Sequence, residues 1–121
     1  MYLRFLPILL CLTGLGWLPA ASGQTVGVDL AKARNCLACH QVDSKRVGPS
    51  FKLVAERFAG QAGADEYLAG AIRNGGRGRW GAVPMPAQPQ VSPADAKLLA
   101  AWILSLADGD RAPVPAVGKP G

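Results

Sequence analysis

Apolar residues recur at the three- and four-residue spacing of a helix in four stretches of the chain. These stretches cover residues 29–40, 51–58, 62–74 and 93–106. Suitable boundary residues stand at their ends: Ser50 and Ser92 can each cap a helix, and Gly60 and Gly75 can each end one. The pattern shows no strand and no internal repeat, so we predict an all-α fold of about four short helices.

The segment between the third and fourth helices, residues 75–91, has no periodicity. Its first half is rich in glycine and its second half in proline. Glycine permits sharp bends and proline restricts the backbone, so we predict an ordered loop. Trp80 and Met85 lie inside this loop, and such large apolar side chains need a surface on which to pack.

The start of the chain has the pattern of a secretory signal. Arg4 is followed by an apolar run of 14 residues at 5–18 and then by small residues. This run is shorter than the roughly 18 residues of a membrane-spanning helix. We predict a signal peptide over residues 1–23, cleaved after Gly23 or alternatively after Ala20. A globular domain at 24–108 and a disordered Pro/Gly-rich tail at 109–121 follow.

Removal of the signal changes the composition that matters for chemistry. The remaining 98 residues carry a net charge of +4, with two Cys, one His and one Met. A single His excludes a pair of catalytic histidines and a multi-histidine metal site. Predicted export, together with the lack of interleaved aromatic and basic residues, argues against a nucleic-acid partner.

The two cysteines and the histidine form one motif, Cys36-Leu37-Ala38-Cys39-His40. C-x-x-C-H is the attachment sequence of c-type haem, in which two thiols form thioethers with the haem and the His binds the iron. A thioredoxin-like site would need a surrounding βαβ unit, and a structural zinc site would need four ligands. A plain disulfide would leave His40 without a role. We therefore predict one covalently bound haem c.

A six-coordinate haem iron needs a second axial ligand. No second His is present, and Met85 is the one Met left after the signal is removed. It stands in the sequence Val83-Pro84-Met85-Pro86, where the flanking prolines hold the loop extended. A Met that only fills a core usually belongs to a helix or strand stripe. We predict that His40 and Met85 are the iron ligands.

The chain resembles a known family at this point, the small bacterial class I cytochromes c, whose short type serves as periplasmic electron carriers. The resemblance covers residues 29–107, and its motifs are CLACH at 36–40, VGPSF at 47–51, DEYLAGAIRNGG at 65–76, RWGAVPMPAQ at 79–88 and DAKLLAAWILSL at 95–106. It implies the class I cytochrome c fold, four helices around one haem, with the first and last helices crossing.

The resemblance also implies roles for two further residues. Pro49 matches a proline whose carbonyl accepts the Nδ1–H of the haem-ligating histidine, here His40. Trp80 matches a tryptophan whose indole N–H bonds a haem propionate.

The chain departs from the family pattern at one position near the haem site and matches it at another. Ala71 stands where related proteins often have a basic residue that reaches a propionate. One of Arg73, Arg77 and Arg79 could take over that charge, and a solvated loop is the alternative for all three. Gln88 matches a position whose amide can donate to the Met sulfur.

The resemblance implies that the protein is a periplasmic carrier of single electrons and not an enzyme. Its partners would be redox proteins: a donor such as a quinol-oxidising complex, and an acceptor such as a terminal oxidase or reductase. We expect a monomer. Two alternatives stay open from the sequence, a cytochrome subunit fixed in a dehydrogenase or reductase complex, and a gas-binding haem module.

Overall fold

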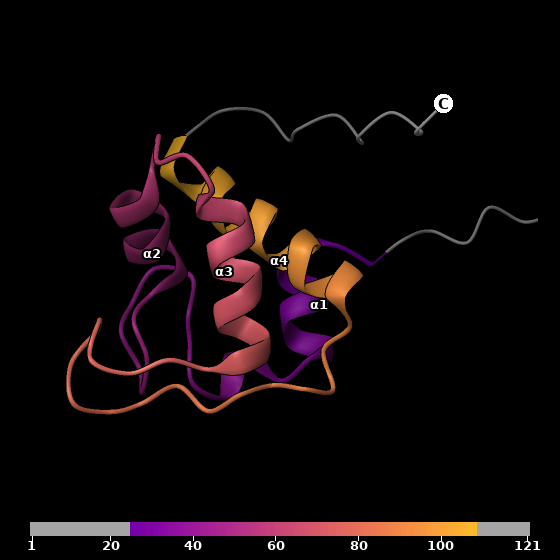
Figure 1. Ribbon diagram of the computed structural model, residues 1–121, viewed down its shortest axis with the longest axis horizontal. Helices are drawn as coiled ribbons and strands as arrows, with labels where there is room; N and C mark the ends of the chain where they lie inside the picture. The colour runs from indigo at the N-terminus through magenta and orange to yellow at the C-terminus, as the bar shows by residue number, and fades with distance from the viewer. Residues whose placement is uncertain (1–24, 109–121) are drawn as a thin grey trace, which may run out of the picture.

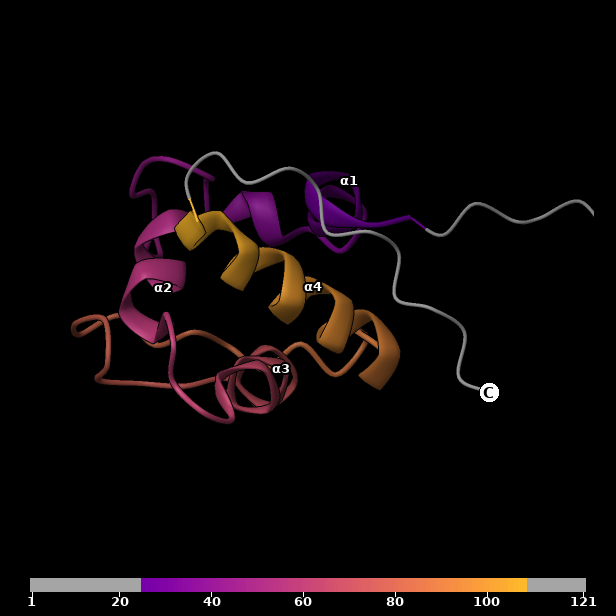
Figure 2. The same cartoon turned by 90° about the horizontal axis from the view of Figure 1, so that it is seen from above.

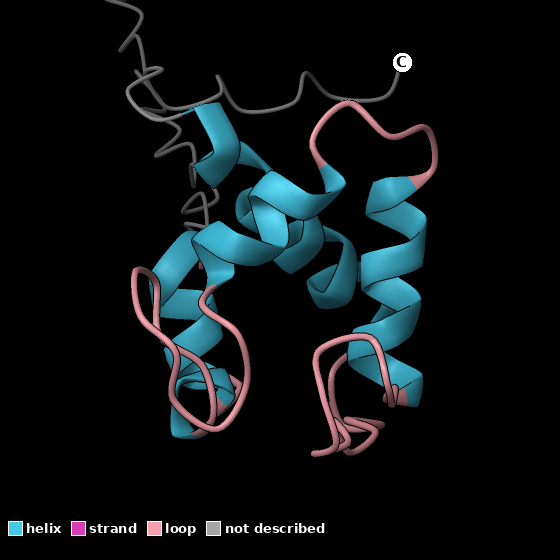
Figure 3. Ribbon diagram, turned by 90° about the vertical axis from the view of Figure 1, so that its left-hand side faces the viewer, coloured by secondary structure: helices cyan, strands magenta, loops and turns pink. Residues whose placement is uncertain are grey.

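The computed structural model describes residues 25–108, and in that range the chain consists of helices and loops with one isolated β-bridge (Figure 3). The elements are α1 (Gly27–Ala33), the 3-10 turn η1 (Cys36–Ala38), α2 (Phe51–Phe58), α3 (Ala64–Asn74), α4 (Pro93–Ser105) and the 3-10 turn η2 (Leu106–Asp108). The prediction of an all-α fold with four helices is confirmed. No helix between residues 25 and 108 has both the length and the apolar character to cross a membrane. The predicted signal peptide and tail lie outside the described residues.

The first helix is shorter than the sequence pattern predicts. α1 ends at Ala33, and Asn35 then adopts a left-handed backbone conformation with φ 61°. Asparagine tolerates this conformation better than most residues, but an α-helix cannot continue through it. The prediction of one helix over residues 29–40 is therefore wrong. The turn η1 begins after this break and contains the first three residues of the C-x-x-C-H motif.

Helix α4 is the centre of the fold. Between different α-helices, the main packing contacts are those of α4 with α1, α2 and α3, and Figures 1 and 2 show α4 running between the other three. Its buried side chains include Leu99 and Ile103, and nearby Val91 is fully buried. Helices α2 and α3 also meet directly, where the rings of Phe58 and Tyr67 stack with their centroids 5.2 Å apart.

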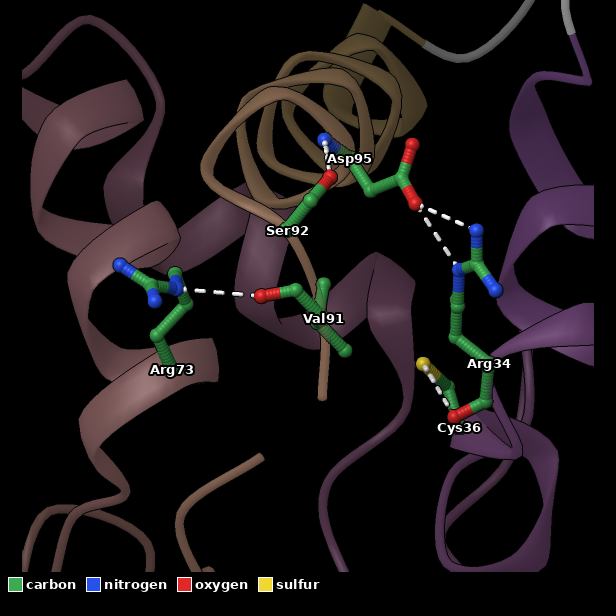
Figure 4. Close-up of polar contacts among 6 residues, drawn as sticks. All are labelled: Arg34, Cys36, Arg73, Val91, Ser92 and Asp95. Carbon is green, nitrogen blue, oxygen red and sulfur yellow. Dashed lines mark hydrogen bonds and ion pairs between the residues drawn. The ribbon is translucent and has the colours of Figure 1, made fainter. Parts of the chain in front are cut away.

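Polar contacts fix the ends of the helices. Ser50 Oγ accepts from the Leu53 N–H at 3.1 Å, and Ser92 Oγ accepts from the Asp95 N–H at 3.1 Å, so both predicted caps are confirmed. Asp95 also forms an ion pair with Arg34 at 2.7 Å, which joins the end of α1 to the start of α4 (Figure 4).

Candidate functional site

A cavity of about 770 Å³ is lined by residues of η1, α2, α3 and α4 and by the loops at 39–50 and 75–91. All six residues that the sequence singled out lie in its lining: Cys36, Cys39, His40, Pro49, Trp80 and Met85. Large apolar side chains make up much of the remainder, among them Phe51, Phe58, Leu68, Ile72, Leu99 and Ile103. Two motifs that lie some 40 residues apart in the sequence therefore meet at one apolar cavity.

Both cysteines of the motif are half-buried free thiols. Burial raises the pKa of the Cys36 thiol above its ordinary value, and a backbone hydrogen bond offsets part of that shift. Cys36 Sγ lies 4.0 Å from the carbonyl oxygen of Arg34 (Figure 4). The thiol is thus held neutral at pH 7, at the wall of an apolar cavity, and is not paired with Cys39.

The ring of His40 is held by contacts on two sides. Its Nδ1 lies 2.8 Å from the carbonyl oxygen of Pro49, and because a carbonyl only accepts, Nδ1 carries the proton. In a neutral ring this tautomer leaves the lone pair on Nε2 free, and Nε2 is then the nitrogen that can bind a metal. The ring also stacks on Phe51 with the centroids 5.2 Å apart, and Phe51 in turn makes an edge contact with Trp102. The tautomer and the plane of the imidazole are both fixed.

Gly48 leaves no room for a side chain beside this ring. A Cβ at this position would overlap His40 Cε1 and would lie 2.8 Å from Nδ1. The N–H groups of Val47 and Gly48 both donate to the carbonyl oxygen of Cys39, at 3.1 and 2.8 Å, so the loop cannot easily move away. Gly48 lies in the VGPSF motif at 47–51, and the sequence pattern alone does not indicate this close approach.

Replacement of Gly48 by alanine is expected to push the His40 ring off the Pro49 carbonyl. Overpacking of this kind costs about 1–3 kcal/mol, so the melting temperature and the yield of haem-loaded protein should both fall. Gly70 on α3 is the matched control, because a Cβ there meets nothing within 4 Å. Thermal melts of Gly48→Ala and Gly70→Ala followed by circular dichroism would contradict this account if the two variants behaved alike.

The loop that carries Met85 is anchored to the end of α3. Gly76 and Met85 exchange two backbone hydrogen bonds of 3.0 and 2.8 Å, and the Gln88 N–H donates to the carbonyl of Ile72 at 3.1 Å. Gly75 has φ 76°, and a Cβ there would lie 2.6 Å from the Met85 carbonyl oxygen. The backbone around Met85 is therefore fixed against α3. The side-chain amide of Gln88 donates to the Pro86 carbonyl at 3.2 Å. The resemblance implied a contact from this amide to the Met85 sulfur instead.

Within the described part of the chain, the cavity lining contains basic residues and no Asp or Glu. The basic residues are Arg34, Lys45, Arg57, Arg77 and Arg79. Arg73 is not among them: its Nε donates to the Val91 carbonyl at 3.1 Å (Figure 4), and the residue borders a different, smaller cavity. Of the three loop-side arginines considered for a propionate, only Arg77 and Arg79 thus line the cavity. Arg57, an exposed residue of α2, lines it too.

These residues fit a c-type haem. Two unpaired thiols stand at C-x-x-C spacing, one imidazole keeps a free Nε2, and one thioether faces the same apolar space. The cationic lining suits a group with carboxylates. In residues 25–108, no group of three or more His, Cys, Asp or Glu side chains could hold a metal ion.

Comparison with known proteins gives one consistent result. The cytochrome c family model matches residues 24–107. Cytochrome c-552 of Nitrosomonas europaea is 55% identical over 78 residues, 64% of this chain and 76% of that protein. Cytochrome c-551 of Azotobacter vinelandii is 53% identical over 79 residues, 65% of this chain and 95% of that protein. The crystal structure of the wild-type Nitrosomonas protein aligns with a TM-score of 0.64 over 65% of this chain and 98% of its own.

Proposed function

The chain belongs to the cytochrome c family, and from this premise we propose how its residues hold the haem, where it works and what it meets. In common with its c-551 and c-552 relatives it is a monohaem electron carrier and not an enzyme. The observation that supports the proposal most strongly is the convergence of the C-x-x-C-H turn and the Met85 loop on one apolar cavity.

Four residues hold the haem in this proposal. Cys36 and Cys39 form the two thioethers, His40 binds the iron through Nε2, and Met85 binds it through its sulfur. The bound haem supplies a metal centre that takes up and returns one electron. Pro49 orients the His40 ring through the 2.8 Å contact to Nδ1, and hydrogen bonding of this kind also raises the basicity of the ligand.

The surrounding residues exclude water from the site and hold its ligands in fixed positions. Buried side chains such as Leu68, Ile72 and Leu99 form an apolar wall that excludes water and lowers the local dielectric. The anchored backbone of Gly76 and Met85 and the stacked ring of His40 give both ligands fixed positions. Little then has to move when the charge of the metal centre changes, which suits rapid electron exchange. Trp80 donates its indole N–H to a haem propionate in this proposal.

The partners are redox proteins that approach the cationic side of the cavity. We propose export to the periplasm, a quinol-oxidising donor, and an oxidase or reductase as acceptor. The lining contains five cations and no acid among the described residues, so an acidic partner surface is favoured. Small, charge-steered interfaces form and separate quickly, as a shuttle requires. The carrier is a monomer in this proposal.

Salt dependence tests the shuttle directly. Reduction of the purified ferric protein by quinol-supplied membranes of the producing cell should slow severalfold between low and high ionic strength, because salt screens charge steering. Reduction by a small neutral reductant is the control and should change little. Recovery of the protein from the periplasm only in a stoichiometric complex, with a rate insensitive to salt, would instead make it a fixed subunit.

A further inference from the structure

Two arginines from different elements stack on aromatic rings at one corner of the cavity. The guanidinium of Arg57 on α2 lies 4.6 Å from the ring centroid of Trp80. That of Arg79, in the loop after α3, lies 4.8 Å from the Tyr67 ring and 5.3 Å from the Phe58 ring. The two arginines are joined, because Arg57 Nη1 donates to the Arg79 carbonyl at 2.9 Å. We name these five residues the arginine–aromatic cluster.

Neither arginine of the cluster is neutralised by a carboxylate. The ion pairs found in residues 25–108 are Arg34 with Asp95 and Lys52 with Asp43, and no acid lines the cavity in that part of the chain. Two guanidinium groups are thus held near one another and beside the cavity without a counter-charge. Such an arrangement favours an anionic group in the space they border.

Trp80 lines the cavity, as do the other four residues of the cluster. Arg57 covers one face of the indole, and this cation–π contact restrains the ring. Within residues 25–108 the Trp80 N–H makes no hydrogen bond, and the half-exposed side chain lines the cavity. Ala71, also in the lining, supplies no charge.

We propose that Arg57 is a positioning residue for Trp80 and brings the positive charge that compensates the haem carboxylate at this corner, in place of the basic residue missing at Ala71. Arg79 supports it by holding the loop through its carbonyl and its own ring contacts. This inference rests on the proposed haem ligation. The charge that compensates the haem carboxylate then comes from Arg57, an exposed residue of α2, and not from Arg77 and Arg79 of the loop alone.

The experiment measures the reduction potential of the haem-loaded protein as a function of pH. A carboxyl group near the metal centre gives the potential a pH-dependent step, and a nearby cation lowers the pKa at which the step occurs. Arg57→Gln should therefore move the step upward by roughly half a pH unit or more, and the potential above the step should fall. Arg57→Lys, which keeps the charge but loses the planar stack, should shift the step less.

Two further variants separate a specific role from a general loss of charge. Lys97→Gln removes one exposed cation from α4, where it borders a different, smaller cavity, and should leave the step in place. In a Trp80→Phe background, Arg57→Gln should have a smaller effect than in the natural chain, because the indole N–H that Arg57 positions is already absent. The other titratable or charged groups of the lining stay constant in all variants: Arg34, Cys36, Cys39, His40, Lys45, Tyr67, Arg77 and Arg79.

The outcomes distinguish this inference from the function on which it rests. The far-red absorption band of a Met–ferric-haem bond should persist in Arg57→Gln. A persistent band with a pH step that matches Lys97→Gln would overturn the role of Arg57 alone. Absence of the band from the unsubstituted protein would overturn the proposed ligation itself.

Discussion

A chain with alanine at both Cys36 and Cys39 is expected to retain no haem after denaturation. Thioethers are the only bonds to haem in this account that survive unfolding, since the bonds from His40 and Met85 to the iron depend on the fold. The two half-buried thiols line the cavity and are not joined to one another. Haem staining and the mass of the chain in a denaturing gel measure the effect.

The single substitutions serve as controls for this first prediction. Cys36→Ala and Cys39→Ala should each leave one attachment point and a reduced yield of covalently loaded chain. The double variant should also fold poorly, because its apolar cavity of about 770 Å³ would be filled with water. Covalent haem at the natural level in the double variant would show that the motif does not attach it.

Substitution of Met85 by histidine is expected to lower the reduction potential by a few tenths of a volt, within the roughly 0.8 V over which axial ligands tune haem. A thioether is a soft, weakly basic donor that favours Fe(II), whereas imidazole is a stronger donor that favours Fe(III). The iron should remain low-spin if the loop lets the new side chain reach it. Potentiometry with optical detection measures the change.

Met85→Ala should give a different result, an open coordination position. The ferric haem should become high-spin, and the ferrous haem should bind carbon monoxide. Three other donors have partners or places elsewhere: Lys52 pairs with Asp43, Lys97 borders another cavity, and the Gln88 side-chain amide donates to the Pro86 carbonyl. A Met85→Ala protein that kept the far-red band and the natural potential would exclude Met85 as a ligand.

Local sequence signals predicted the parts of the fold that depend on local chemistry. The apolar spacing located α2, α3 and α4, and the two serine caps appear where their side chains can accept a backbone N–H. The break after α1 was not predicted, because apolar spacing continues through Asn35 and only its left-handed backbone ends the helix. Periodicity records which face is buried but not every backbone dihedral.

Contacts between distant segments were the harder part of the site to predict. Arg57 occupies an exposed position on an amphipathic helix, and its role depends on a loop residue 23 positions later, Trp80. Arg73 lies close to Arg77 and Arg79 in the sequence, but in the structure its Nε donates to the Val91 carbonyl. The close approach of Gly48 to His40 likewise follows from loop conformation. None of these contacts leaves a periodic signal.

An optical redox titration of the unsubstituted haem-loaded protein tests the central claim most directly. The account predicts a low-spin ferric spectrum with the far-red Met–iron band. It also predicts that this band disappears on reduction, in a single step that fits the transfer of one electron. The ferrous form of the unsubstituted protein should not bind carbon monoxide. A high-spin ferric spectrum without the band, together with rapid carbon monoxide binding, would contradict ligation by Met85 and favour a gas-binding haem protein.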